Sequence, residues 1–184
     1  VEITNFIIPM GTLIDYSVNI YDVFTRIPSV RAKLRNYSYL RGDIYVRIAI
    51  SGSPFHYGKV LVSYQPFAND NVPLGYIDGI LSGSERTQAL TYLSQSENVA
   101  VLDVHENMPL DMMCPYINVQ PMMRLFNRSP LIIGDATPYQ DAISMGRLYI
   151  QSINEVRAAT PTPTNVSIFV YAWMENVELG TPTG

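Results

Sequence analysis

Residues 44–66 read IYVRIAISGSPFHYGKVLVSYQP, and this stretch decides the fold class of the chain. Across Ile44–Ile50 an aliphatic residue stands at every second position, which is the pattern of a half-buried β-strand. Ser51–Pro54 carries turn residues, and Lys59–Gln65 is a second β-branched and aromatic run that stops at a proline. The stretch therefore predicts two strands that pair as a hairpin.

The same kind of pattern recurs along the chain. Further strands are predicted at Val99–Val104, Met112–Val119, Arg147–Ile153 and Val166–Met174, with two weaker ones at Thr12–Tyr16 and Ile20–Phe24. Both faces of the strand at Val166–Met174 are expected to be covered, because its two alternating sets are both largely apolar or aromatic. A total of about eight strands separated by turn residues is typical of an all-β sandwich or barrel.

Helix is scarce in the predicted structure. Pro28 followed by Ser29–Arg35 predicts one short helix, and Glu85–Leu93 predicts a second. Phe67–Leu81 is expected to be a long surface loop, and Ala158–Thr164 an extended spacer, because its alternating prolines block helix and ladder bonds. With no internal repeat and no interdomain linker, residues 1–184 are expected to form a single domain.

The composition limits the function classes. The chain has 184 residues, of which 47% are apolar and 15% charged, so it can bury a core and does not have a disordered composition. A formal charge of −4 argues against a main surface that grips nucleic acid. No apolar run approaches the ~18 residues of a membrane span. The single cysteine, Cys114, excludes an internal disulfide and agrees with maturation in a reducing compartment.

Catalytic and metal-binding patterns are weak. His56 and His105 are the two histidines, and both are expected to be turn or surface residues and not catalysts. Two isolated histidines do not supply the metal site of a cupin-like enzyme. No cofactor is expected. Calcium binding by loop carboxylates stays open beside their interpretation as solvated turn residues; the carboxylates concerned are Asp70, Asp78, Asp135 and Asp141.

Residues 108–123 form an unusual segment, MPLDMMCPYINVQPMM, with five methionines around three prolines. Methionine fills irregular gaps in cores and also adapts to partner surfaces. The segment therefore admits two interpretations, a buried strand with its loop or an interaction surface. In both cases Cys114 has apolar neighbours, which disfavour a reactive thiolate.

Four segments together resemble the capsid subunits of picorna-like viruses, that is, of picornaviruses and their dicistrovirus, iflavirus and marnavirus relatives. These segments are Ile27–Lys33 with Tyr39–Ile50, then Gly52–Pro66, Pro115–Met122, and Gly146–Val156 with Val166–Pro182. The second of them carries F-H-x-G before a strand that ends near proline, and the third carries P-Y-I-N. In these two features the chain most resembles the subunit conventionally counted second.

The resemblance implies an eight-stranded antiparallel jelly-roll β-sandwich of the viral capsid type, with one or two short helices. It also implies a structural, non-enzymatic subunit that is cut from a polyprotein and joins copies of itself and two related subunits in an icosahedral shell around genomic RNA. Its expected location is the virion, after assembly in the host cytoplasm. The start at Val1 and the lack of a basic arm suggest that the N-terminal arm is incomplete. Whether the chain contacts RNA, and whether it binds a host receptor, therefore stay open.

Assembly through loops and extended segments would use exposed residues of the methionine-rich segment and the proline-rich spacer. The candidates for the assembly interface are Met112, Met113, Tyr116, Met122, Met123, Pro161 and Pro163. If Met112 and Met113 belong to an interface, lysine at both positions is expected to leave a folded monomer that no longer assembles.

Arg41-Gly42-Asp43 spells a tripeptide that many integrins recognise. Because Asp43 leads directly into Ile44, whose side chain is expected in the core, the tripeptide is predicted to be a strand start and not an adhesion ligand. The alternative function for the whole chain is a jelly-roll binding module, either lectin-like or receptor-ligand-like. In that case Tyr76 or Tyr139 would stack on a sugar.

Overall fold

The computed structural model describes residues 1–67, 83–125, 141–142, 145–159 and 165–182. The strands in chain order are β1 (Glu2–Ile8), β2 (Asp15–Val18), β3 (Tyr37–Ser51), β4 (His56–Tyr57), β5 (Lys59–Pro66), β6 (Val99–Asp103), β7 (Leu110–Cys114), β8 (Met123–Arg124), β9 (Gly146–Ser152), β10 (Arg157–Ala158) and β11 (Val166–Pro182). The helices are α1 (Ile20–Arg26), α2 (Pro28–Leu34) and α3 (Gly83–Ser94).

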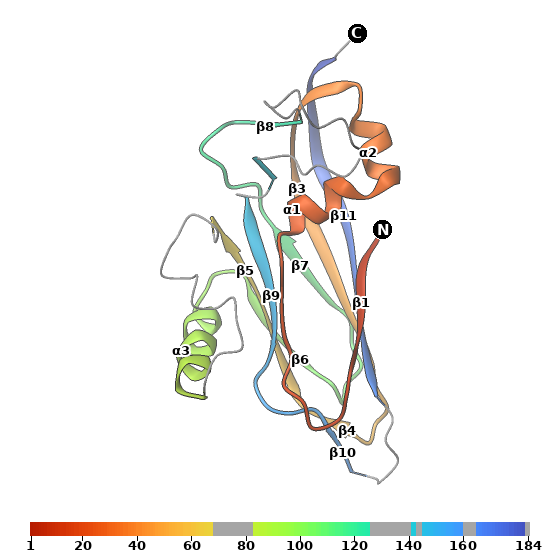
Figure 1. Cartoon of the computed structure of the whole chain (residues 1–184), viewed down its shortest axis with the longest axis vertical. Coiled ribbons are helices and arrows are strands. Elements are labelled where there is room, and N and C mark those ends of the chain that lie inside the picture. Colours follow the sequence, from red (N-terminus) through yellow and green to blue (C-terminus); the bar gives the residue numbers. More distant parts are fainter. Residues whose placement is uncertain (68–82, 126–140, 143–144, 160–164, 183–184) are drawn as a thin grey trace, which may run out of the picture.

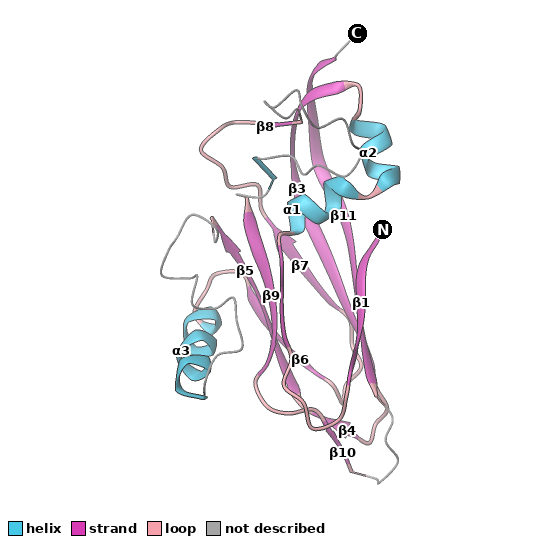
Figure 2. Ribbon diagram, viewed as in Figure 1, coloured by secondary structure: helices cyan, strands magenta, loops and turns pink. Residues whose placement is uncertain are grey.

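Two antiparallel sheets form the two layers of the molecule (Figure 1). The first has the order β1-β11-β3-β7, with β8 also paired to β3, and the second has the order β2-β9-β5-β6. Strands β4 and β10 make a separate two-stranded ribbon at one end. Figure 2 shows that strands make up most of the described chain. The predicted jelly-roll sandwich is confirmed, with eight main strands shared equally between the two sheets.

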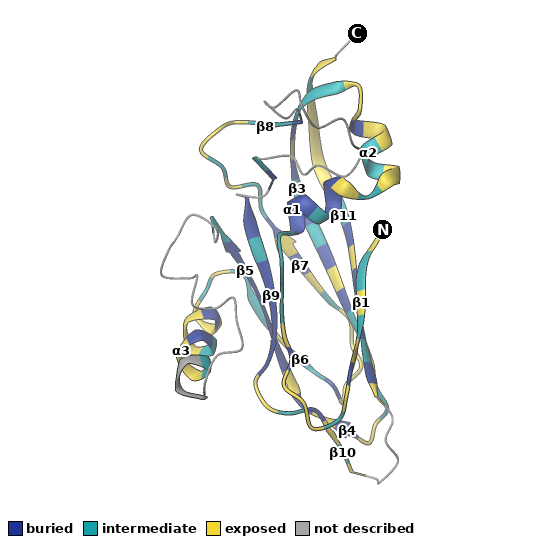
Figure 3. Ribbon diagram, in the orientation of Figure 1, coloured by how far each residue is buried: buried dark blue, intermediate teal, exposed yellow. Residues whose placement is uncertain are grey.

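The core lies between the two sheets. The inward-facing residues of β3 are all buried, as their period-two spacing predicts; they are Ile44, Val46, Ile48 and Ile50. Each such aliphatic side chain contributes roughly 1.5–3 kcal/mol when it is removed from water. The same alternation continues in β11, and Figure 3 shows buried and exposed residues alternating along the long strands. Burial between the sheets is therefore the main force that holds them together.

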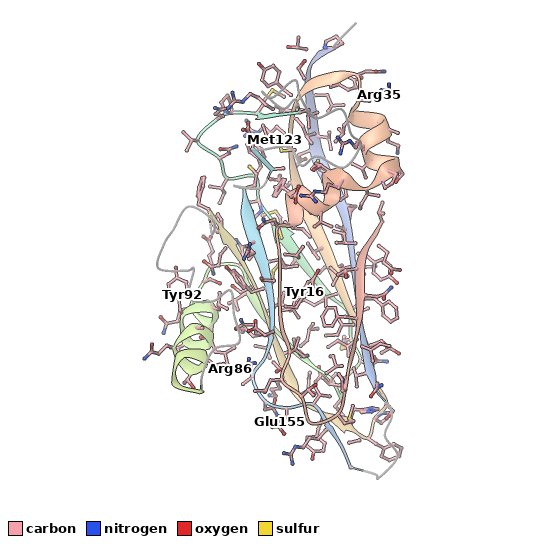
Figure 4. All side chains as sticks on the ribbon, in the orientation of Figure 1. Tyr16, Arg35, Arg86, Tyr92, Met123 and Glu155 are labelled. Carbon is pink, nitrogen blue, oxygen red and sulfur yellow. The ribbon has the colours of Figure 1, made fainter. Side chains whose placement is uncertain are left out.

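Helix α3 covers part of the outer face of the second sheet. Its Ala89 and Leu93 pack on Leu61 and Tyr149, which form a second, smaller apolar cluster. The guanidinium of Arg86, labelled in Figure 4, donates to the backbone carbonyls of residues 14 and 152 at 3.1 and 2.6 Å. The packing of α3 on Leu61 helps to explain why β5 is buried on both faces.

Three predictions about individual elements are wrong. Strands β3 and β5 lie in different sheets, so residues 44–66 form a connection between the layers and not a hairpin. Ile20–Phe24 forms most of α1, because its apolar residues at 20, 21 and 24 share one face of a helix. Strand β11 exposes Tyr171 on its outer face, so only one of its faces is fully covered.

Some boundaries also differ from the predictions. The described residues contain three helices where one or two were predicted, and β1 was not predicted. Strand β7 begins two residues earlier than predicted and ends at Cys114, where Pro115 cannot continue the ladder. Residues 68–81 of the predicted loop and residues 160–164 of the predicted spacer lie outside the described residues.

Candidate assembly surface

In the part of the chain that the structure describes, no group of side chains has the composition of a metal site. No cluster of three or more His, Cys, Asp or Glu side chains occurs there. Cys114 is buried, and burial raises the pKa of its thiol far above the ordinary value, so a thiolate is disfavoured. Asp141 is engaged by Arg124 at 3.1 Å, and the other three calcium candidates lie outside the described residues. No described helix is long and apolar enough to cross a membrane.

Four segments meet at the end of the sandwich that lies at the bottom of Figure 1. We call them together the loop end; they are residues 9–14, 52–58, 104–109 and 153–159. Backbone hydrogen bonds tie them to one another. The Gly11 N–H donates to the Val156 carbonyl at 2.9 Å, and the Ala159 N–H donates to the Phe55 carbonyl at 2.8 Å. Although they are distant in sequence, the segments therefore form one continuous surface.

The loop end exposes several large apolar side chains, with Phe55 59% exposed. The full set is Leu13, Phe55, Tyr57, Met108 and Ile153. Single exposed apolar residues are common on soluble proteins, but a group of them at one end of a molecule is typical of a protein interaction surface. The loop end is therefore a candidate contact surface, and sequence periodicity could not reveal it because these residues lie in connecting segments and in the two-residue strand β4.

The methionine-rich segment divides between core and surface. Met112 is 7% exposed, and Met123, labelled in Figure 4, is fully buried; both pack in the main core. Met113 points to the opposite side of β7 and is 42% exposed, and Met122 is half-buried. Met112 and Met123 thus serve the core in this fold. This burial does not fit the expectation that lysine at both 112 and 113 leaves a folded monomer.

Tyr116 lies just after β7 and is half-buried. Its hydroxyl donates to the Gln120 carbonyl at 3.2 Å, and the Arg41 guanidinium lies 5.8 Å from the centre of its ring. On the same loop Val119 is 91% exposed, the largest exposed fraction of any large apolar side chain among those described. Residues 115–122 therefore form a second candidate contact surface. The two proline candidates at 161 and 163 lie outside the described residues.

The Arg41-Gly42-Asp43 tripeptide lies inside β3, and not at the start of the strand as predicted. The Asp43 carboxylate accepts hydrogen bonds from the Tyr116 N–H at 2.9 Å and from the Asn176 side-chain amide at 3.1 Å. Gly42 is buried, and a Cβ there would lie 2.8 Å from the Met174 sulfur. A receptor would have to break both bonds of the carboxylate, so the geometry favours a structural role for the tripeptide.

Asp43→Glu is expected to lower the free energy of unfolding by about 1–2 kcal/mol, because the longer side chain cannot keep both hydrogen bonds. Chemical denaturation of the purified chain measures the change. The matched control is Asp111→Glu, since Asp111 is exposed on β7 and pairs with Arg47 at 2.6 Å; its expected change is within about 0.5 kcal/mol. Equal stability of the two variants would contradict the structural role of Asp43.

Comparisons of the sequence point to one family. A profile of the family described as picornavirus capsid protein matches residues 18–138. The chain is 26% identical over 153 residues to the structural polyprotein of Acute bee paralysis virus (strain Rothamsted), a match that covers 82% of this chain. It is 25% identical over 187 residues to the genome polyprotein of Deformed wing virus. The chain spans only 14% and 6% of the lengths of these two relatives.

Solved structures share the fold at low sequence identity. A marine algae virus of the order Picornavirales contains a chain that matches with a TM-score of 0.83 at 21% identity, covering 100% of this chain and 72% of that one. A chain of deformed wing virus gives a TM-score of 0.76 at 17% identity, again over 100% and 72% of the two chains. The family profile covers most of the chain and agrees with this fold. The chain therefore belongs to the picornavirus capsid protein family, whose role in the virion is structural and not enzymatic.

Proposed function

We propose that this chain is a capsid subunit that assembles with copies of itself and with two related jelly-roll subunits into an icosahedral shell around an RNA genome. The observation that carries the proposal is the exposed apolar loop end on a jelly roll whose described residues already bury a continuous core between the two sheets. The two curated relatives are polyproteins, and the chain spans only a small part of each. This supports the proposal that one polyprotein supplies the two partner subunits as well. A related pentamer of Israel acute paralysis virus, matched with a TM-score of 0.72, supports assembly.

The subunit position and the domain organisation are part of the same proposal. We assign the chain to the second subunit position, which the F-H-x-G turn at 55–58 and the P-Y-I-N segment at 115–118 support. We also propose that residues 1–184 form one capsid domain, which the continuous main core across both sheets supports. Assembly would take place in the host cytoplasm.

The physical basis of assembly is repetition of modest contacts. A standard interface buries ~800 Å² on each partner, and closed symmetry repeats every such contact around the shell. The loop end and residues 115–122 offer two such surfaces on a rigid framework. Because each contact needs to be only moderately strong, a few exposed apolar anchors on each subunit suffice.

Electron microscopy of particles from the native source, with sedimentation and nuclease treatment, tests this function. The expected result is closed spherical particles that contain this chain with two similar partners and protect RNA. Small soluble oligomers, with the full-length chain and its partners all present, would contradict the proposal and favour the binding module. For that alternative the two sugar-stacking candidates, Tyr76 and Tyr139, lie outside the described residues.

A further inference from the structure

The outer face of the first sheet carries an aromatic surface that belongs neither to the core nor to the loop end. In the strand register Trp173 of β11 lies opposite Tyr45 of β3, and Tyr45 lies opposite Met113 of β7. Tyr171 precedes Trp173 by two residues on β11 and so lies on the same face. We call these four residues the aromatic platform. Their neighbours along each strand belong to the core, so the platform faces away from it.

The platform is open to solvent. The rings of Tyr45 and Trp173 stack with their centres 5.7 Å apart and their planes 17° from parallel. Beside them Met113 is 42% exposed and Tyr171 is 36% exposed. A contiguous group of exposed aromatic and apolar side chains is typical of a surface that binds another molecule.

The charged groups beside the platform are already paired. The Arg47 guanidinium donates to both carboxylate oxygens of Asp111 at 2.6 Å, and its central carbon lies 5.7 Å from the centre of the Trp173 ring. The Glu175 carboxylate accepts from Trp173 Nε1 at 2.7 Å. One arginine beside two carboxylates gives these residues no excess of positive charge, so they do not match a phosphate backbone. An uncharged partner fits the platform best.

An extended proline-rich segment is an uncharged partner of the right kind. Such a segment loses little conformational entropy when it binds, and its proline rings pack on the rings of tryptophan and tyrosine. This chain carries one at Ala158–Thr164, which reads AATPTPT and contains no charged residue. Its residues 160–164 lie outside the described residues.

The segment cannot reach the platform of its own chain. It joins β10 to β11 at the loop end, at the bottom of Figure 1. Trp173 lies ~23 Å along β11 from Val166, at the usual rise of a β-strand. The connection from Ala158 to Val166 spans at most ~29 Å when fully extended. It is therefore too short to run out to Trp173 and back.

We infer that the aromatic platform of one copy receives the proline-rich segment Ala158–Thr164 of a neighbouring copy. The contact joins two different surfaces, because the segment continues the loop end whereas the platform lies on a sheet. Head-to-tail contacts of this kind generate rings when the rotation between copies closes. The inference deepens the proposed function and rests on it for the identity of the neighbour. Binding of the segment by an isolated chain does not depend on that function.

Fluorescence of the isolated chain tests the platform, because Trp173 is its single tryptophan. A peptide of residues 158–165 with blocked ends is expected to change the emission in a saturable way, with half-saturation on the order of 1 mM. Tyr45→Ser and Met113→Ser are each expected to weaken binding at least ~5-fold, with thermal unfolding as the check that they fold. Tyr92→Ser, on an exposed aromatic residue of α3, is the matched control and should bind like wild type.

Three results would overturn the assignment of the platform. They are an unchanged emission up to about 10 mM peptide, equal binding of a peptide with alanine in place of both prolines, and binding of a uridine oligonucleotide in place of the peptide. The third result would assign the platform to nucleic acid.

Cross-linking in particles tests the neighbouring copy. Tyr171→Cys combined with Pro163→Cys is expected to give disulfide-linked chains on mild oxidation, whereas Tyr92→Cys combined with Pro163→Cys should give none. The native Cys114 is buried and does not compete. Particles without linked chains would contradict the inference. If no particles form, the proposed function fails while the peptide result on the isolated chain stands.

Discussion

Met112→Lys is expected to lower the free energy of unfolding of the chain by about 3–5 kcal/mol, whereas Met113→Lys is expected to leave that free energy almost unchanged. In β7 the two residues point to opposite faces of the sheet. Met112 lies opposite Val46 and packs in the core, while Met113 lies opposite Tyr45 on the outer face. A lysine at 112 would bury an ammonium without a partner, at a cost of about 3–5 kcal/mol. Total stabilities of single domains are only about 5–15 kcal/mol.

Circular dichroism with thermal unfolding separates the two variants. Met113→Lys is expected to unfold within a few degrees of wild type, since exposed substitutions change stability by about 0.5 kcal/mol or less. Met113→Lys is also the useful variant for assembly, because a loss of particles from it cannot be ascribed to unfolding. If both variants fold equally well, the inward direction of Met112 is wrong, and with it the register between β3 and β7.

Replacing Phe55 and Tyr57 together by serine is expected to reduce particle yield at least ~100-fold while the subunit stays folded. Exposed aromatic side chains are the usual anchors of protein interfaces, and truncation of one central anchor costs ~2 kcal/mol or more. Symmetry repeats that loss at every copy of the contact. Sedimentation of co-expressed subunits measures the yield, and thermal unfolding of the isolated chain verifies the fold.

Tyr92→Ser is the matched control for this variant. Tyr92, labelled in Figure 4, is an aromatic residue on α3 that is 51% exposed, close to the exposure of Phe55, but it lies away from the loop end. Its particle yield should stay near that of wild type. A normal yield from the double variant, or an equal loss in the control, would contradict the assignment of the loop end as the assembly surface.

The sequence was most informative where a strand has one buried face. The alternation in Ile44–Ile50 predicted both the strand and its inward side chains. A strand with one buried face needs an apolar residue at every second position, and this pattern can be read from neighbouring residues alone. Ile20–Phe24 was misjudged because a short apolar run fits strand and helix alike, and only its packing in the main core distinguishes them.

The sequence by itself determined the all-β class, the positions of most strands, and the resemblance to the capsid family. Tertiary structure alone decided that β3 and β5 lie in different sheets, that Met112 is buried while Met113 is exposed, and that His56 meets Ser53 inside a turn beside His105. The physical reason is the separation along the chain of the residues that interact. Propensity and periodicity act between residues a few positions apart, whereas burial and hydrogen-bond partners depend on surfaces that only the folded chain brings together.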